Sequence, residues 1–182
     1  GCTFGWTTAL GMNALLGNTG DCNTAVGCNA LCNTNSGKEN TAIGHLSLRN
    51  NQTGNSNTAV GQKAMLFNDS GKNNVAVGVN ALFRNSTGSW NTGVGLNALY
   101  YSDTGCYNTS IGWQSGIGSD TGCYNTSVGT CTLANISTCS GNTTIGSNSL
   151  EQVTGSFNTA IGYRAGYTQT SGDYNVIIGN EV

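Results

Sequence analysis

The sequence of 182 residues predicts an all-β protein, a parallel β-roll or β-solenoid of about ten stacked 17-residue coils. A pentad of the type Asn-Thr-Ala-Val-Gly recurs along the chain at a spacing of seventeen residues. Its fourth residue is always Val or Ile, and its fifth residue is always Gly. No helix fits this pattern, since Gly interrupts every candidate segment. Identical residues that recur once per coil are typical of proteins in which each repeat is buried against the next.

The pentads share one register along the chain. The first eight begin exactly seventeen residues apart, and the ninth follows a coil that is one residue shorter. We therefore expect a single repeat array over 1–182, with a partial first coil (1–22), regular coils (23–174) and a truncated last coil (175–182), as a fragment of a longer fibre. The leading asparagines are Asn23, Asn40, Asn57, Asn74, Asn91, Asn108, Asn125, Asn142, Asn158 and Asn175.

The leading Asn is taken as position 1 of each coil. A β-branched residue in every copy of position 4 predicts a short strand with this side chain buried in the core. Alternation along the strand places position 2, mostly Thr, on the same face and position 3 on the opposite face. A second strand is expected where small residues occupy position 8 and Leu position 9. The expected core ladder is Val26, Ile43, Val60, Val77, Val94, Ile111, Val128, Ile145, Ile161 and Ile178.

Position 3 is small in nearly every coil and never charged, from Ala25 to Ile177. A strand with no charged, solvent-facing side is expected where a neighbouring chain approaches closely. This pattern favours a side-by-side homotrimer with position 3 near the shared axis. The alternative interpretation is a single-chain solenoid with a narrow interior.

The recurring residues Asn-Thr-Ala-Val-Gly-x-x-Ala-Leu resemble the Ser-Val-Ala-Ile-Gly-x-x-Ala motif of YadA-like heads in trimeric autotransporter adhesins. They resemble still more closely the Asn- and Thr-rich repeats of phage and virus tail fibres. The resemblance covers Thr7 to Gly179. It implies a left-handed parallel β-roll, three identical chains side by side, and a role in attachment to a glycan or protein receptor on a host surface. The repeat is longer here than in the adhesin heads, and eight cysteines are unusual for a bacterial adhesin.

Charge and hydropathy exclude other classes of function. Only 8% of the residues are charged, the net charge is −2, and the six Lys and Arg residues are scattered. We therefore expect no nucleic-acid partner, because a protein that binds nucleic acid needs a basic patch on its surface. No apolar run is long enough to insert into a membrane. The expected location is extracellular, on a cell or virion surface.

The sequence contains no assembly of catalytic residues. His45 is the only histidine, so neither a Ser-His-Asp site nor a multi-histidine metal site can form within one chain. The Asp-Thr-Gly tripeptides at Asp103 and Asp120 lie at position 13 of consecutive coils and are interpreted as Asx-type turns, with a weak calcium site as the alternative. We expect no enzyme activity and no cofactor.

Two sets of polar residues are candidates for covalent modification. Cys106 and Cys123 share position 16 of adjacent coils, and a separation near the coil rise of about 4.8 Å lies within the range that a disulfide accepts. Asn51, Asn68 and Asn85 begin Asn-x-Ser/Thr tripeptides at position 12. We expect this row on the outer turn, where it is a candidate for glycosylation.

Aromatic residues also fall into register, immediately before the pentad. They form either a ligand-binding stripe for sugars or an aromatic ladder that covers the coil edge or a seam between chains. The stripe favours a carbohydrate-binding module, and the Thr ladder at position 2 favours an ice-binding solenoid if it faces outward. Both are alternatives to a structural or attachment fibre. The aromatic residues are Trp90, Tyr107, Tyr124, Phe157 and Tyr174.

Overall fold

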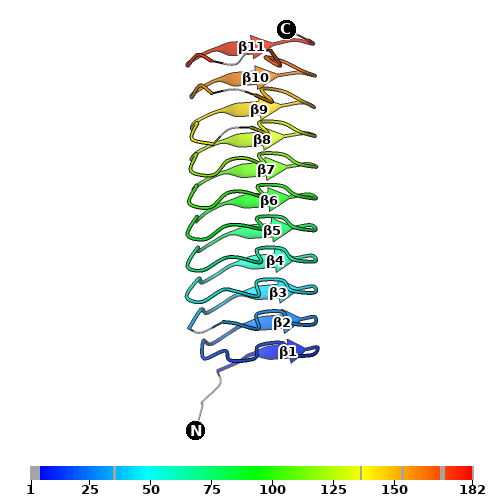
Figure 1. Cartoon of the computed structure of the whole chain (residues 1–182), viewed down its shortest axis with the longest axis vertical. Coiled ribbons are helices and arrows are strands. Elements are labelled where there is room, and N and C mark those ends of the chain that lie inside the picture. Colours follow the sequence, from blue (N-terminus) through cyan, green and yellow to red (C-terminus); the bar gives the residue numbers. More distant parts are fainter. Residues whose placement is uncertain (1–4, 35, 136, 153, 169–170, 182) are drawn as a thin grey trace.

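The computed structural model describes residues 5–34, 36–135, 137–152, 154–168 and 171–181. Over these residues the chain winds into a column of coils stacked along one axis (Figure 1). Each coil contributes one three-residue strand to a single eleven-stranded parallel sheet, and the strands lie in chain order. The described residues contain no helix. The predicted all-β solenoid with a repeat of about seventeen residues is confirmed.

The strands occupy positions 2 to 4 of each repeat and pair in one register. Ala59, for example, lies opposite Ala42 on one side and Ala76 on the other. Thr143 pairs with Thr159 although the intervening coil is one residue short, so the turns absorb the missing residue. The strands are β1 (Thr8–Leu10), β2 (Thr24–Val26), β3 (Thr41–Ile43), β4 (Thr58–Val60), β5 (Val75–Val77), β6 (Thr92–Val94), β7 (Thr109–Ile111), β8 (Thr126–Val128), β9 (Thr143–Ile145), β10 (Thr159–Ile161) and β11 (Val176–Ile178).

The second half of each coil is a stack of turns, and the prediction of a second strand was wrong. Residues at positions 7 and 9 have positive φ, as in Lys63 (57°) and Met65 (51°), so the chain does not extend there. Hydrogen bonds between coils are nevertheless kept, because the amide of Met65 donates to the carbonyl of Ala81 at 2.9 Å. The coils are therefore tied together on both sides.

The core lies between position 3 of the strand and positions 8 and 9 of the turns. Ala59 and Ala76 at position 3 are fully buried, as are Ala81 and Leu82 at positions 8 and 9. A Cβ built on Gly93, at position 3, would lie 3.4 Å from Cγ of Leu82. The leucines therefore reach across the coil to the strand, which leaves room there only for small side chains.

The expected orientation of the strands was therefore wrong. Position 3 faces the interior, not a shared axis, and position 4 faces outward. The leucines at position 9 occupy the space opposite position 3, where the residues are small in every coil but those of Thr144 and Ile177. The residues that prove to lie outside the core are Val26, Ile43, Val60, Val77, Val94, Ile111, Val128, Ile145, Ile161 and Ile178.

A ladder of buried asparagines at position 1 joins successive coils. The side-chain oxygen of Asn74 accepts the backbone N–H of Asn91 at 2.9 Å, and its Nδ2 donates to the carbonyl of Gly88 at 2.8 Å. Nδ2 also lies 3.1 Å from Oδ1 of Asn57. Each of these amides is buried, and its polar atoms are paired, as burial requires. The repeated Asn therefore has a structural role in every coil.

Candidate functional site

The outward side of the sheet forms a long uncharged surface, here called the strand face. It consists of the side chains at positions 2 and 4 of strands β2 to β10. The threonines at position 2 are half-exposed, and Ile43, Ile111 and Ile145 at position 4 are each more than 40% exposed. Val75, which replaces Thr at position 2, is 37% exposed. Ranks of Thr and of Val or Ile thus run side by side along the column.

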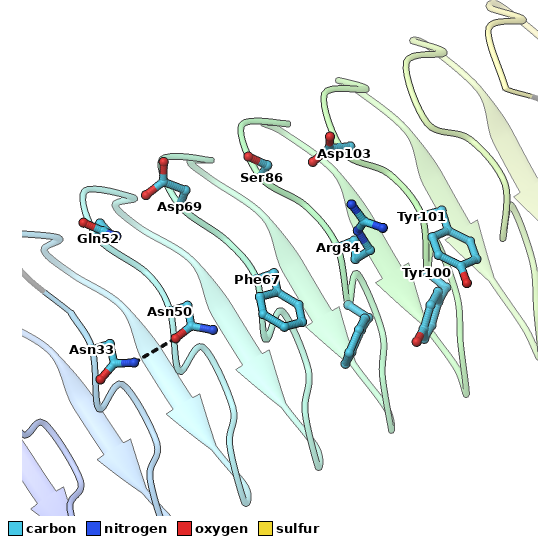
Figure 2. Close-up of a pocket in the computed structure, with 11 residues that line it drawn as sticks. Asn33, Asn50, Gln52, Phe67, Asp69, Arg84, Ser86, Tyr100, Tyr101 and Asp103 are labelled. Carbon is cyan, nitrogen blue, oxygen red and sulfur yellow. Dashed lines mark hydrogen bonds between the residues drawn. The ribbon is translucent and has the colours of Figure 1, made fainter.

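A second feature, here called the axial groove, runs along the turns. It has a volume of about 810 Å³. Figure 2 shows two rows of side chains that follow the column axis, one at position 11 and one at position 13. The position 11 row is Asn33, Asn50, Phe67, Arg84 and Tyr101, and the position 13 row is Gln52, Asp69, Ser86 and Asp103.

Four aromatic rings form one side of the axial groove. Phe67 and Phe83 meet edge to face, with ring centroids 5.3 Å apart and an interplanar angle of 83°. Phe83 stacks on Tyr100 at 4.7 Å, and Tyr100 meets Tyr101 edge to face at 4.6 Å and 75°. Phe67 and Tyr101 remain 47% exposed. Neither Phe67 nor Tyr101 has a described ring stacked parallel to it.

The polar side of the groove carries charges of both signs. Arg84 lies between Phe67 and Tyr101 in the stacked position 11 row, to which it is joined by parallel backbone bridges. Asp69 and Asp103 follow at position 13 (Figure 2). Burial, together with neighbouring Tyr101, raises the pKa of Tyr100, and Arg84 opposes that shift. A second hollow of about 320 Å³ extends the groove past Asp103 toward Asp120.

The groove was not predicted from the sequence. From the sequence, Asp103 and Asp120 are interpreted as turn residues, with a weak calcium site as the alternative, and no prediction is made for the aromatic residues at positions 10 and 11. One signal was available, since Phe83-Arg84 and Tyr100-Tyr101 recur seventeen residues apart. Other coils carry Arg49-Asn50 or Ile117-Gly118 there, so the signal is local and does not belong to the repeat.

The aromatic residues that precede the pentad form a stacked ladder. Trp90 and Tyr107, then Tyr107 and Tyr124, lie with centroids 5.0 Å apart and planes within 3° of parallel. Phe157 and Tyr174 stack in the same way at 5.1 Å. Gly141 interrupts the run because it has no side chain, and the ring of Phe157 lies where its Cβ would be. The rings of a stacked run cover one another's faces and present mainly their edges, which suits a ladder along the coil edge.

The position 12 asparagines lie inside the fold, so their predicted outer-turn location was wrong. Asn51, Asn68 and Asn85 are fully buried. Nδ2 of Asn68 donates to Oδ1 of Asn51 at 2.6 Å, and Nδ2 of Asn85 donates to Oδ1 of Asn68 at 2.8 Å. A glycan on these amides does not fit the folded coil, because the amides form a second internal ladder.

Cys106 and Cys123 are free thiols, so the structure does not contain the expected disulfide. Each sulfur instead accepts a backbone N–H from the preceding coil. Sγ of Cys123 lies 3.2 Å from the amide nitrogen of Cys106, and Sγ of Cys106 lies 3.4 Å from that of Ser89. Ser89 and Ser140 accept the equivalent bond through their hydroxyl oxygens. Cys at position 16 therefore takes the place of Ser as a hydrogen-bond acceptor.

The remaining candidates do not converge on a site. His45 is exposed at position 6, outside the two rows of the axial groove. In the described ranges, no three His, Cys, Asp or Glu side chains gather as a metal site would require. The same part of the chain has no apolar helix long enough to cross a membrane.

Comparison with known proteins adds no assignment to this geometry. No protein-family model, no curated protein and no solved structure matches the chain. The repeat solenoid fold is consistent with a structural, fibre-like role. The strand face and the axial groove are the two surfaces on which a more specific function depends.

Proposed function

We propose that this chain is a stiff segment of a cell-surface or virion fibre, in which identical chains assemble side by side and present their turns for attachment. The strand face supports this proposal most directly. A continuous rank of exposed Val and Ile side chains runs along this uncharged face, and exposed apolar side chains gathered in this way usually mark protein–protein contacts. The repeat resemblance to trimeric adhesin heads and tail fibres favours three chains.

The strand face suits contact between parallel copies. Its residues repeat with the coil, so two or three columns can match rank against rank along their whole length. No charged side chain occurs at positions 2 or 4 of β2 to β10, so burial of this surface costs no charge desolvation. Burial of Val94 and Ile111 would add apolar area, which drives association.

Light scattering on the purified chain tests the assembly. We expect three times the chain mass for the unmodified protein, and the mass of one chain for Val94→Lys combined with Ile111→Lys. Two unpaired ammonium groups in a closed apolar contact oppose association. Both side chains lie outside the core, so each chain should keep its fold by circular dichroism.

Thr87→Lys is the matched control, because Thr87 is an exposed turn residue away from the strand face. This variant should keep the mass of the unmodified protein. A single-chain mass for the unmodified protein would remove the proposal. An unchanged mass for the double lysine variant would show that the chains associate through a surface other than the strand face.

An ice-binding solenoid is a second candidate, and one observation now favours it. The Thr ladder faces outward, beside the rank of Val and Ile, whereas we had expected it to face the core. Its hydroxyl and methyl groups repeat at the coil rise of about 4.8 Å, which makes a regular surface. Side-by-side assembly would cover the same surface, so the two functions exclude each other.

Thermal hysteresis measurements decide between the two candidates. An ice-binding chain should depress the freezing point below the melting point, and Thr92→Lys combined with Thr109→Lys should abolish the gap by breaking the flat array. A fibre segment should give no gap. A gap in a protein with the mass of one chain would replace the fibre proposal with ice binding.

A further inference from the structure

The axial groove deepens the proposed function, because an attachment fibre requires a ligand. We propose that the groove binds a linear, uncharged oligosaccharide, which lies along the column axis. A role of this groove in attachment rests on the fibre proposal, but the groove itself is formed within one chain. Binding can therefore be measured whether or not the chains assemble.

The aromatic residues of the groove are not required by the fold. Phe83 and Tyr100 occupy position 10, where other coils have Cys32, Arg49 or Ala134, and those coils close equally well. The rings of the groove come from three consecutive coils only. Phe83 and Tyr100 are partly buried, and Phe67 and Tyr101 are 47% exposed. Exposed large apolar side chains that a fold does not need are typical of binding surfaces.

The ring geometry suits the apolar face of a sugar. Phe67 and Tyr101 lie two coils apart in the position 11 row, about 10 Å by the coil rise. Each ring meets its aromatic neighbour at a steep angle and remains 47% exposed, so no described ring stacks face to face on it. The C–H face of a pyranose ring stacks on such a surface, and successive sugars of one chain can use both platforms.

The polar side of the axial groove offers hydrogen-bonding capacity that the protein does not use. The side chains of Gln52, Asp69, Arg84 and Asp103 form no hydrogen bond or ion pair with any other described residue. Together they supply amide and guanidinium donors and carboxylate acceptors. A ligand with many hydroxyl groups, each both donor and acceptor, can satisfy this mixed set.

The charge balance favours a neutral ligand. Asp69 and Asp103 in the groove, with Asp120 at its extension, outnumber the single guanidinium of Arg84. A uronic acid, a sialic acid or a sulfated sugar would bring its negative charge next to these carboxylates, and like charges in contact oppose binding.

The length of the groove favours a linear chain of several sugars. The position 11 row runs from Asn33 to Tyr101 over five consecutive coils, a span of about 19 Å by the coil rise. The rows are parallel to the column axis (Figure 2). A branched or single sugar would leave most of this length empty.

Binding is tested on the purified chain with an oligosaccharide array. The array carries linear hexamers of glucose, N-acetylglucosamine, mannose and galactose, and acidic hexamers of galacturonic acid and polysialic acid. We expect at least one neutral hexamer to bind, and the acidic hexamers not to bind. Titration calorimetry with that hexamer should show about tenfold weaker binding for Tyr101→Ala and for Phe67→Ala.

Tyr124→Ala and Phe157→Ala are the matched controls, because these rings are at least as exposed as Phe67 and Tyr101 but belong to the stacked ladder. They should bind the hexamer as the unmodified chain does, and melting curves should show that all four variants fold. The proposal is overturned if no neutral hexamer binds, if acidic hexamers bind better, or if loss of Tyr101 and Phe67 leaves the affinity unchanged. The mass by light scattering is independent of these outcomes, so failure here would leave the fibre proposal in place.

Discussion

Replacement of Gly61 by alanine is expected to lower the melting temperature by roughly 10 °C, which corresponds to a loss of about 3 kcal/mol. Gly61 has a φ of 134°, which L-residues rarely adopt. A Cβ there would also lie 2.4 Å from the carbonyl oxygen of Gly78 in the next coil. That coil cannot retreat without loss of its bond from the Gly78 amide to the Val60 carbonyl.

Gln62→Ala is the control for this variant, since Gln62 is the exposed neighbour of Gly61 and lies outside the core. Its melting temperature should stay within about 2 °C of the unmodified chain. Thermal melts followed by circular dichroism give both values. Equal melting temperatures for the two variants would show that the coils can separate enough to admit a methyl group.

Asn74→Ala is expected to cost about 3 kcal/mol in the free energy of unfolding, measured by chemical denaturation. The backbone N–H of Asn91 loses its acceptor, and an unpaired buried donor is costly. The carbonyl of Gly88 loses one of its two side-chain donors and retains that of Asn85. Alanine also leaves a cavity where the buried amide of Asn74 lay, and this cavity adds to the loss.

The exposed amide of Asn33 provides the comparison for Asn74. Its Nδ2 donates to Oδ1 of Asn50 at 2.9 Å, but no backbone group depends on it. Asn33→Ala should therefore change the free energy of unfolding by no more than about 0.5 kcal/mol. If both variants lost the same amount, the buried ladder would be no more important to stability than a surface contact.

Sequence periodicity was sufficient for the architecture but not for the orientation of the strands. The pentad register correctly predicted parallel strands at positions 2 to 4, because one repeat can pair with the next in only one way. Alternation alone leaves two choices for the inner face. Leu82 and its equivalents decide between the two faces, because they reach across the coil to position 3. The spacing of the repeat does not reveal this contact between positions 9 and 3.

The axial groove could not be predicted for a different reason. Its rows come from positions 11 and 13, which vary from coil to coil, so the repeat carries no information about them. Phe67, Arg84 and Tyr101 become neighbours only because the turns also stack in register. The buried asparagines at position 12, by contrast, were misplaced because Asn-x-Ser/Thr tripeptides say nothing about which way a turn residue points.

The direction of the hydrogen bonds between coils has a mechanical consequence. The strands lie across the column, so the bonds that join them run along its axis (Figure 1). A pull at the two ends loads the junctions between coils one after another, and the weakest junction carries the whole force. Each released coil supplies seventeen residues, or roughly 56–61 Å of extended chain, in place of a rise of about 4.8 Å. Such a column would yield coil by coil and lengthen greatly before it broke, whereas a bundle of several columns would share the load.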